Sequence, residues 1–249
     1  MLVKKMLAAA GAVCIFSHVA SAEWERTIST WDSRLTDQGE VQVALWGWYE
    51  PADHADYVSG RLYLNYGLAN NWNFSVAPGY AYMDIDGVGS DSGITDTGLS
   101  STYRFMDEAT AGFDLALMGG VSLPTGDEDD GFGSDKVEPE LTLIAAKTLG
   151  AVVVVGNVGG SYVVDANEGT EDFQLYGAAE GILPVTDQLS INTVLTAATS
   201  RVEDGDEMVD IGLGIRFTPS ECMFIVASGF VCLTDAYDEA YQLAAGFKF

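Results

Sequence analysis

The stretch AYQLAAGFKF, residues 240–249, alternates between apolar and polar side chains. One face carries Tyr241, Leu243, Ala245, Phe247 and Phe249, and the other carries Gln242, Ala244, Gly246 and Lys248. A period of two is the pattern of a β-strand with one apolar and one polar face. This segment is therefore predicted to be a strand, either of a soluble sheet or of a membrane β-barrel, and the rest of the chain distinguishes the two.

The first 22 residues have the three parts of a secretory signal peptide. Lys4 and Lys5 form a basic start, residues 6–16 an apolar core, and Ala20-Ser21-Ala22 a cleavage site of small residues. The core is shorter than the roughly 20 apolar residues that a spanning helix needs. We therefore expect residues 1–22 to be a signal peptide that is cleaved during export.

The composition narrows the class of the exported chain. Beyond residue 22 it carries nine Lys and Arg against 37 Asp and Glu, an acidic balance that argues against nucleic acid as a partner. A hydrophobic content of 48% argues equally against intrinsic disorder. Cys222 and Cys232 are expected on one strand, too far apart for a disulfide, so no disulfide framework supports the fold.

Twelve alternating segments between clusters of Gly and Asp are predicted to be strands. Their ranges are 40–50, 57–68, 71–83, 94–106, 110–123, 137–149, 151–164, 172–183, 188–201, 207–218, 221–233 and 239–249. In most of them one face is apolar and the other polar. The eleventh is apolar on both faces, so its pattern does not say which face is which.

The connections between these strands are of two kinds. After even-numbered strands they are tight, as at Ala69-Asn70 and Leu149-Gly150. After odd-numbered strands most are longer and acidic, and together they hold 21 of the 37 acidic residues, at 51–56, 84–93, 124–136, 165–172, 202–207 and 234–239. A closed barrel with periplasmic termini has short turns on one side and long loops on the other, whereas a soluble sandwich has no reason to sort its loops.

Aromatic residues on the apolar faces gather at the strand ends. Those near the tight turns are Tyr66, Trp72, Phe74, Tyr103, Phe105, Phe217, Phe247 and Phe249, and those near the long loops are Tyr49, Tyr80, Tyr82, Tyr162, Phe173 and Tyr241. Two aromatic rings around an aliphatic band are typical of a barrel in a bilayer. We predict an all-β fold, a transmembrane antiparallel β-barrel of about 12 strands at residues 39–249 in the bacterial outer membrane, with a periplasmic segment at 23–38.

The polar faces supply candidates for the lumen of the barrel. Strand parity places in it Trp46, Trp48, Arg61, Asp96, Arg104, Asp114, Glu138, Glu140, Glu180, Asp210, Arg216 and Lys248. Charges of both signs predict either ion pairs that fill a plugged lumen or the walls of a narrow path. Trp46 and Trp48 either line a path for aromatic solutes or pack against the segment 23–38.

One motif carries a resemblance to a known family. The run Leu123-Pro124-Thr125-Gly126-Asp127, followed by Glu140-Leu141 and residues 147–150, resembles the central motif of the outer-membrane transporter family named for the MetA pathway of phenol degradation, and residues 35–40 resemble its start. The resemblance implies a role in moving aromatic compounds across the outer membrane. The alternation that ends at Phe249 also resembles the C-terminal signature read by the barrel-assembly machinery, with Tyr241, Leu243, Phe247 and Phe249 as its residues.

Catalytic and metal sites have weak support. His54 between Asp53 and Asp56 has the elements of a water-activating dyad, but three polar residues in one loop are more simply a solvated loop, so we predict no enzyme. Asp127, Asp129 and Asp135 alternate with glycines as in calcium loops, yet the EF-hand spacing is absent. We therefore expect a solvated acidic loop, no metal and no cofactor.

Two functions remain open on the sequence. The first is a channel or carrier for small, hydrophobic or aromatic solutes. The second is a non-conducting structural barrel whose acidic outer loops associate with cations or lipopolysaccharide. In both, outer-membrane lipid and the assembly machinery are expected partners.

Overall fold

The computed structural model describes residues 30–249 except 34, 53–54, 88, 128–130, 167–168, 202–204, 206 and 235–237. Its elements are β1 (Val41–Ala52), β2 (Ala55–Ala69), β3 (Trp72–Ile85), β4 (Gly89–Met106), α2 (Glu108–Ala111), β5 (Asp114–Leu123), β6 (Glu138–Leu149), β7 (Val152–Tyr162), β8 (Phe173–Pro184), β9 (Leu189–Ala198), β10 (Met208–Ser220), β11 (Met223–Cys232) and β12 (Glu239–Lys248). Among these residues, no helix has the length and apolar composition that crossing a membrane requires.

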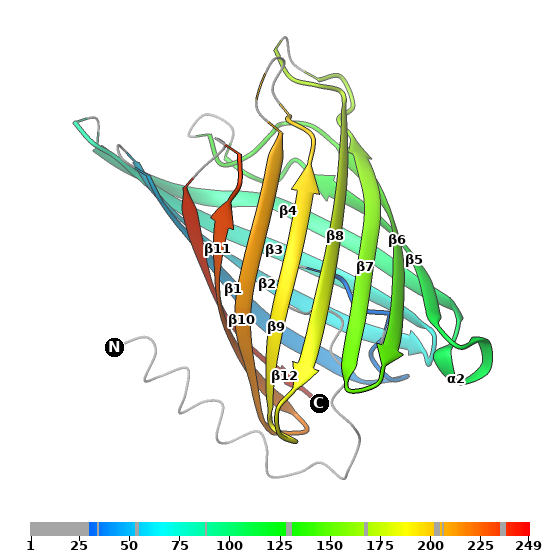
Figure 1. Ribbon diagram of the computed structural model, residues 1–249. Helices are drawn as coiled ribbons and strands as arrows, with labels where there is room; N and C mark the ends of the chain where they lie inside the picture. Colours follow the sequence, from blue (N-terminus) through cyan, green and yellow to red (C-terminus); the bar gives the residue numbers. More distant parts are fainter. Residues whose placement is uncertain are drawn as a thin grey trace.

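The twelve strands form one closed antiparallel barrel (Figure 1). Each strand pairs with its neighbours in the sequence, and β1 pairs with β12 from Gln42 opposite Lys248 to Tyr49 opposite Tyr241. Val41 and Phe249 exchange backbone hydrogen bonds of 3.1 and 2.9 Å at the end of this seam. The predicted fold class is confirmed. We call the end of the barrel with the tight turns and the Val41–Phe249 bonds the turn end, and the opposite end the loop end.

Side chains alternate between the outside and the lumen along every strand. The exposed faces carry an aliphatic band, and both predicted groups of aromatics lie at its edges, for example Tyr103 at the turn end and Tyr80 at the loop end. The strand that could not be oriented, β11, turns Phe224, Val226 and Phe230 inward, since these are almost completely buried. An apolar outer wall is what hydrocarbon requires, so the barrel is built to span a membrane.

Two local predictions were wrong. A strand was expected from residue 110, but α2 stands at 108–111 and β5 begins at Asp114. The Asp107 side chain caps α2, and Gly112 ends it in the left-handed region, so local hydrogen bonds override the alternation there. Longer loops were expected at 51–56 and 84–93, but β1 and β2 remain paired as far as Ala52 and Ala55, and β3 and β4 as far as Ile85 and Gly89. Outside the membrane two strands can remain paired by backbone hydrogen bonds without alternating apolar side chains, so the sequence pattern does not reveal the pairing.

The lipid-facing position of Leu213 gives a test of the fold. Leu213 lies in the middle of β10 and Leu233 just beyond β11 at the loop end, and both side chains are 60% exposed. We expect Leu213→Arg to lower the stability of the inserted barrel by about 2–4 kcal/mol and Leu233→Arg by about 0–1 kcal/mol, because only the former places a charge at the centre of the hydrocarbon. Urea titration of the barrel in lipid vesicles measures both, and equal losses would contradict the assigned membrane position.

Candidate functional site: the lumen of the barrel

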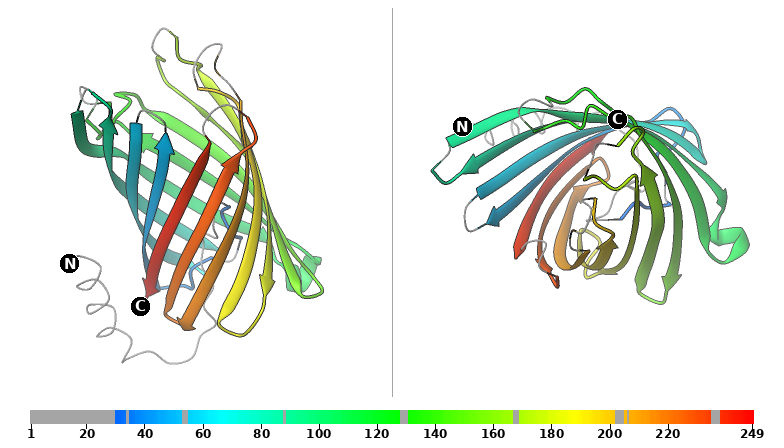
Figure 2. Two further views of the ribbon diagram at one scale, coloured as in Figure 1. Left: turned by 60° about the vertical axis from the view of Figure 1, so that its left-hand side comes forward. Right: turned by 90° about the horizontal axis from the view of Figure 1, so that it is seen from above.

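Part of the segment before β1 lies inside the barrel (Figure 2). We call the described residues 30–33 and 35–36 the plug segment. Its polar residues Thr30, Asp32 and Ser33 are at most 1% exposed, and Leu35 is 2% exposed. The described residues of the predicted periplasmic segment 23–38 therefore include a stretch that occupies the lumen, while residues 23–29 lie outside the described part of the chain.

The plug segment is hydrogen-bonded to three strands of the wall. Thr30 Oγ1 donates to Glu180 Oε2 on β8 at 2.9 Å, and Ser33 Oγ donates to Asp114 Oδ2 on β5 at 3.2 Å. Asn157 on β7 accepts from the backbone N–H of Trp31 at 2.6 Å and donates to its carbonyl at 3.0 Å. Because such bonds contribute about 1 kcal/mol each, several together fix the segment against the wall.

The chain between the plug segment and β1 is held by the backbone at the turn end. Gly39 N–H donates to the Gly67 carbonyl at 2.8 Å, and Gly67 N–H donates to the Glu40 carbonyl at 3.1 Å. A Cβ on Gly67 would lie only 1.9 Å from the Asp37 carbonyl oxygen, so this close approach requires glycine. The turn fixes where the plug segment enters the barrel.

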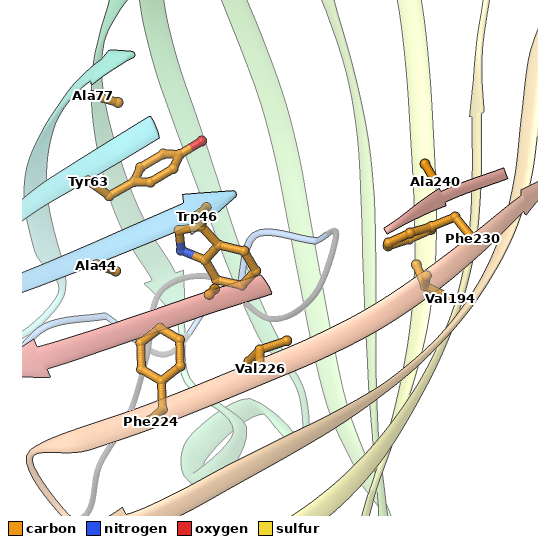
Figure 3. Packing of buried hydrophobic residues seen from close by; sticks show 10 residues of the cluster. Ala44, Trp46, Tyr63, Ala77, Val194, Phe224, Val226, Phe230 and Ala240 are labelled. Carbon is orange, nitrogen blue, oxygen red and sulfur yellow. The ribbon is translucent and has the colours of Figure 1, made fainter. Parts of the chain in front are cut away.

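Aromatic side chains cover the inner wall along β1 and β11. Trp46 and Phe224 have ring centroids 6.0 Å apart, and Trp48 and Phe230 have centroids 5.1 Å apart. Figure 3 shows Trp46 and Phe224 facing each other across the lumen side of the two strands. We call these four residues the aromatic strip. Trp31 of the plug segment packs against the same cluster and meets Tyr63 edge to face at 5.8 Å.

A larger cavity of about 570 Å³ lies toward the loop end, beside the aromatic strip, since Arg61 in its wall is opposite Trp46 in the strand register. We call it the vestibule. Its main side chains come from β2, β4, β6 and the segments after β5 and β9, and are Tyr57, Arg61, Thr95, Asp96, Phe132, Ser134, Glu138, Glu140 and Arg201. By contrast, the space between Trp31 and the aromatic strip is about 10 Å³, the size of one water. The lumen is thus open at the loop end and nearly closed between Trp31 and the aromatic strip, and a further cavity of about 470 Å³ lies at the turn end beside the turns after β8 and β10.

The vestibule charges differ in how well they are neutralised. Arg201 donates to Glu138 through two nitrogens, one at 2.7 Å, and to Gln174 Oε1 at 2.9 Å. Glu140 accepts only from Tyr176 Oη, at 3.3 Å, among the described residues. Arg61 reaches only the Asp96 carbonyl, at 3.5 Å, and forms no ion pair with a described carboxylate. Arg61 and Glu140 therefore have unused hydrogen-bonding capacity at the vestibule wall.

The family-like motif at 123–127 anchors the loop between β5 and β6. Asp96 on β4 accepts three hydrogen bonds from this loop, from Gly126 N–H at 2.9 Å and from Ser134 N–H and Oγ at 2.9 and 2.6 Å. Asp127 adds a backbone bond to the Ile94 carbonyl at 3.0 Å and accepts from Phe132 N–H at 2.7 Å. The motif folds the loop over the rim of β4 and sets Phe132 into the vestibule.

The other predicted lumen residues lie inward but apart from the vestibule. Asp114 and Glu180 hold the plug segment, and Asp210 accepts from Thr196 Oγ1 at 2.9 Å. At the turn end, Arg104 pairs with Asp107 at 3.4 Å, Lys248 pairs with Glu40 at 3.5 Å, and the Arg216 guanidinium lies 4.9 Å above the Phe224 ring. The structure therefore divides the predicted set among vestibule, aromatic strip, plug contacts and turn end.

Several lumen residues were not expected from the sequence. Trp31 and Ser33 precede the first strand, where no alternation assigns them a direction. Strand parity points Arg201 outward, but β9 ends at Ala198 and the chain turns back over the mouth. Tyr176 follows the inward parity of Glu180 on β8, so counting from that residue would have found it.

Within the described part of the chain, no group of three or more His, Cys, Asp or Glu residues is arranged to hold a metal ion. The metal hypothesis for Asp127, Asp129 and Asp135 is not tested by this, because Asp129 lies outside the described residues. The described residues also do not include His54 and Asp53 of the dyad considered above, or the predicted signal peptide at 1–22, so these predictions are not tested either. Neither Cys222 nor Cys232 forms a disulfide, and both are buried.

Comparison with known proteins finds one family and several barrels of similar fold. A family model described as "Putative MetA-pathway of phenol degradation" matches residues 43–179. The chain is similar to the COG4313 outer membrane channel from Pseudomonas putida F1, with a TM-score of 0.75 and 15% identity over 88% of this chain and 98% of that one. No curated protein sequence matches the chain.

Two porins are also similar in fold. The KdgM porin superposes with a TM-score of 0.57 and 9% identity, covering 83% of this chain and 99% of that chain. The NanC porin gives a TM-score of 0.51 and 9% identity, covering 83% and 100%. At these identities the likeness shows the fold alone, a closed antiparallel β-barrel.

The anchored loop leads to a test at Gly126. A Cβ there would lie 2.7 Å from Gly133 Cα and 2.9 Å from Asp96 N, atoms of the backbone that cannot yield cheaply. We expect Gly126→Ala to open the loop 124–137 and to raise its cleavage rate by protease on intact cells about tenfold. Gly119→Ala is the matched control, because nothing lies within 4 Å of its added Cβ. Equal cleavage in the two variants would show that the motif does not hold the loop.

Proposed function

The chain belongs to the MetA-pathway phenol-degradation family, and we propose that it is an outer-membrane channel for small hydrophobic or aromatic solutes. The observation that carries this proposal is the lining of the lumen, in which the aromatic strip on β1 and β11 lies beside the polar vestibule, with Trp46 opposite Arg61 in the strand register. A solute with a ring and a polar group finds a partner for each. A filled barrel without transport would not need a 570 Å³ cavity that opens at the loop end.

We propose the following roles for the other parts of the chain. Residues 1–22 direct export, and the strand at 239–248 with Tyr241, Leu243 and Phe247, followed by Phe249, is read by the barrel-assembly machinery. The acidic loops face the lipopolysaccharide side. The lumen-facing residues act on the solute through the vestibule, where Arg61, Glu138 and Glu140 lie, and through Trp46 and Trp48.

The plug segment decides between an open channel and the alternative of a non-conducting structural barrel. Because Trp31 of this segment packs against the aromatic strip and leaves only about 10 Å³ between them, we expect deletion of residues 23–36 to raise single-channel conductance in planar bilayers several-fold over the full chain. Deletion of 23–29 alone is the control, since it keeps every contact of Trp31 with the wall. No conductance in any of the three proteins would favour the structural barrel.

The charge of the lumen predicts the sign of the selectivity. Asp96, Glu138 and Glu140 outnumber Arg61 and Arg201 in the vestibule. Together with 21 acidic residues in the predicted outer loops they concentrate cations at the mouth. We expect a cation-selective reversal potential in a salt gradient, which weakens as salt rises because exposed charges are screened beyond about 8 Å at physiological ionic strength.

Two substitutions locate the source of this selectivity. Glu140→Gln should shift the reversal potential toward zero, whereas Asp187→Asn, in the turn between β8 and β9, should leave it unchanged. Anion preference in the wild type, or a selectivity that ignores Glu140, would contradict the charge argument.

A further inference from the structure

A row of side chains crosses β6, β7 and β8 beside the vestibule. Thr142 on β6 is opposite Gly159 on β7, and Gly159 is opposite Tyr176 on β8. A Cβ on Gly159 would lie 2.8 Å from Tyr176 Cε2 and 2.8 Å from Thr142 Oγ1, which is closer than ordinary contact. Glycine at this position therefore lets the Tyr176 ring lie across β7 and reach β6.

The Tyr176 hydroxyl joins two side chains of β6. Its oxygen lies 2.6 Å from Oγ1 of the buried Thr142, and it donates to Glu140 Oε2 at 3.3 Å. A hydroxyl has one proton, and Tyr176 gives it to the carboxylate, so Thr142 is the donor of the shorter bond. A buried partner thus fixes the position of Tyr176, and Tyr176 in turn fixes one oxygen of Glu140.

The rest of the Glu140 side chain lies against bare backbone. Gly120 on β5 is opposite Glu140, and a Cβ there would lie 2.8 Å from Glu140 Cγ and 3.0 Å from its Cδ. Among the described residues, Glu140 takes part in no ion pair. The carboxylate is therefore held between the Gly120 backbone and one neutral hydroxyl, and its charge is not neutralised by a cation of the wall.

A guanidinium is directed at the same part of the wall. Ser161 on β7 is opposite Glu140, and Gln174 on β8 is opposite Ser161. Arg201 donates to Gln174 Oε1 at 2.9 Å and to Ser161 Oγ at 3.5 Å, and it pairs with Glu138. Because neighbouring strands are about 5 Å apart, a guanidinium on Ser161 is one strand away from the Glu140 carboxylate. Arg201 therefore lies close enough to compete for Glu140.

Resting on the cation selectivity proposed above, we propose that Tyr176 is a positioning residue that keeps Glu140 from pairing with Arg201. Glu140 is thereby left as the carboxylate that binds a cation in the vestibule. Asp96 is occupied by three hydrogen bonds from its loop, and Glu138 is neutralised by Arg201. A permeating cation therefore interacts most strongly with the carboxylate that Tyr176 holds.

Carboxyl labelling of the full-length barrel in detergent micelles tests the positioning without requiring conduction. A carbodiimide and an amine label carboxylates that are free of ion pairs, and tandem mass spectrometry distinguishes Glu140 from Glu138. Tyr176→Phe keeps the ring and removes the hydroxyl, so labelling of Glu140 should fall about fivefold, as expected for the loss of one hydrogen bond. Tyr162→Phe, on the exposed face of β7, is the matched control and should be labelled as the wild type is.

A double variant shows whether Arg201 is the competing cation. The loss of labelling caused by Tyr176→Phe should disappear when Arg201→Gln is added, because no guanidinium then captures the released carboxylate. The heat-modifiable band on a gel confirms that each variant is folded. Unchanged labelling of Glu140 in Tyr176→Phe, or a loss that persists without Arg201, would overturn the proposal.

A second double variant connects the position of the carboxylate to selectivity. In planar bilayers, Tyr176→Phe should lower the ratio of K⁺ to Cl⁻ permeability in the wild type and have no further effect in Glu140→Gln. An equal effect in both backgrounds would mean that Tyr176 acts on the fold and not through Glu140, and would overturn the proposal.

The two measurements separate the positioning role from the proposed function. Labelling that depends on Tyr176 in a barrel that never conducts, even without residues 23–36, would keep the positioning role and remove the channel. Conductance with labelling that is independent of Tyr176 would remove the positioning role and keep the channel.

Discussion

The whole structure depends on closure of the backbone ladder between β1 and β12. In hydrocarbon every N–H and C=O needs a protein partner, so twelve strands are tolerated only as a ring without edges. The register from Gln42–Lys248 to Tyr49–Tyr241 and the Val41–Phe249 bonds supply the last pairs. Once the ring is closed, alternation assigns one face of each strand to lipid, and the other face is free to carry function.

A ring of twelve strands is wider than its own side chains fill, because eight strands already enclose a packed interior. A segment of the chain occupies part of this interior, and in it Thr30, Trp31 and Ser33 make polar contacts to β8, β7 and β5. Those contacts are polar since buried backbone and hydroxyl groups must find partners. Toward the loop end the described residues leave a cavity of about 570 Å³, which is the vestibule.

The alternation of apolar and polar side chains predicts the features that the bilayer imposes on the strands, and few others. The strands, their lipid faces and the inward direction of residues such as Glu140 follow from a period of two. Three features do not: α2, because caps at Asp107 and Gly112 set it; the path of Trp31, because the segment before β1 has no period; and the inward turn of Arg201, because it lies past the end of β9. For β11 both faces are apolar, since its inner face packs in the aromatic strip.

The motif that carries the family resemblance shapes the wall of the vestibule and supplies part of its lining. The Gly126 N–H donates to the Asp96 carboxylate, which also accepts from Ser134 N–H and Oγ. These hydrogen bonds occupy a carboxylate that would otherwise lie unpaired at the wall of the cavity. Glu140 on β6 belongs to the later part of the motif and, like Arg61 on β2, keeps free hydrogen-bonding capacity. The motif therefore fixes the shape of the cavity through Gly126 and supplies one of its polar side chains through Glu140.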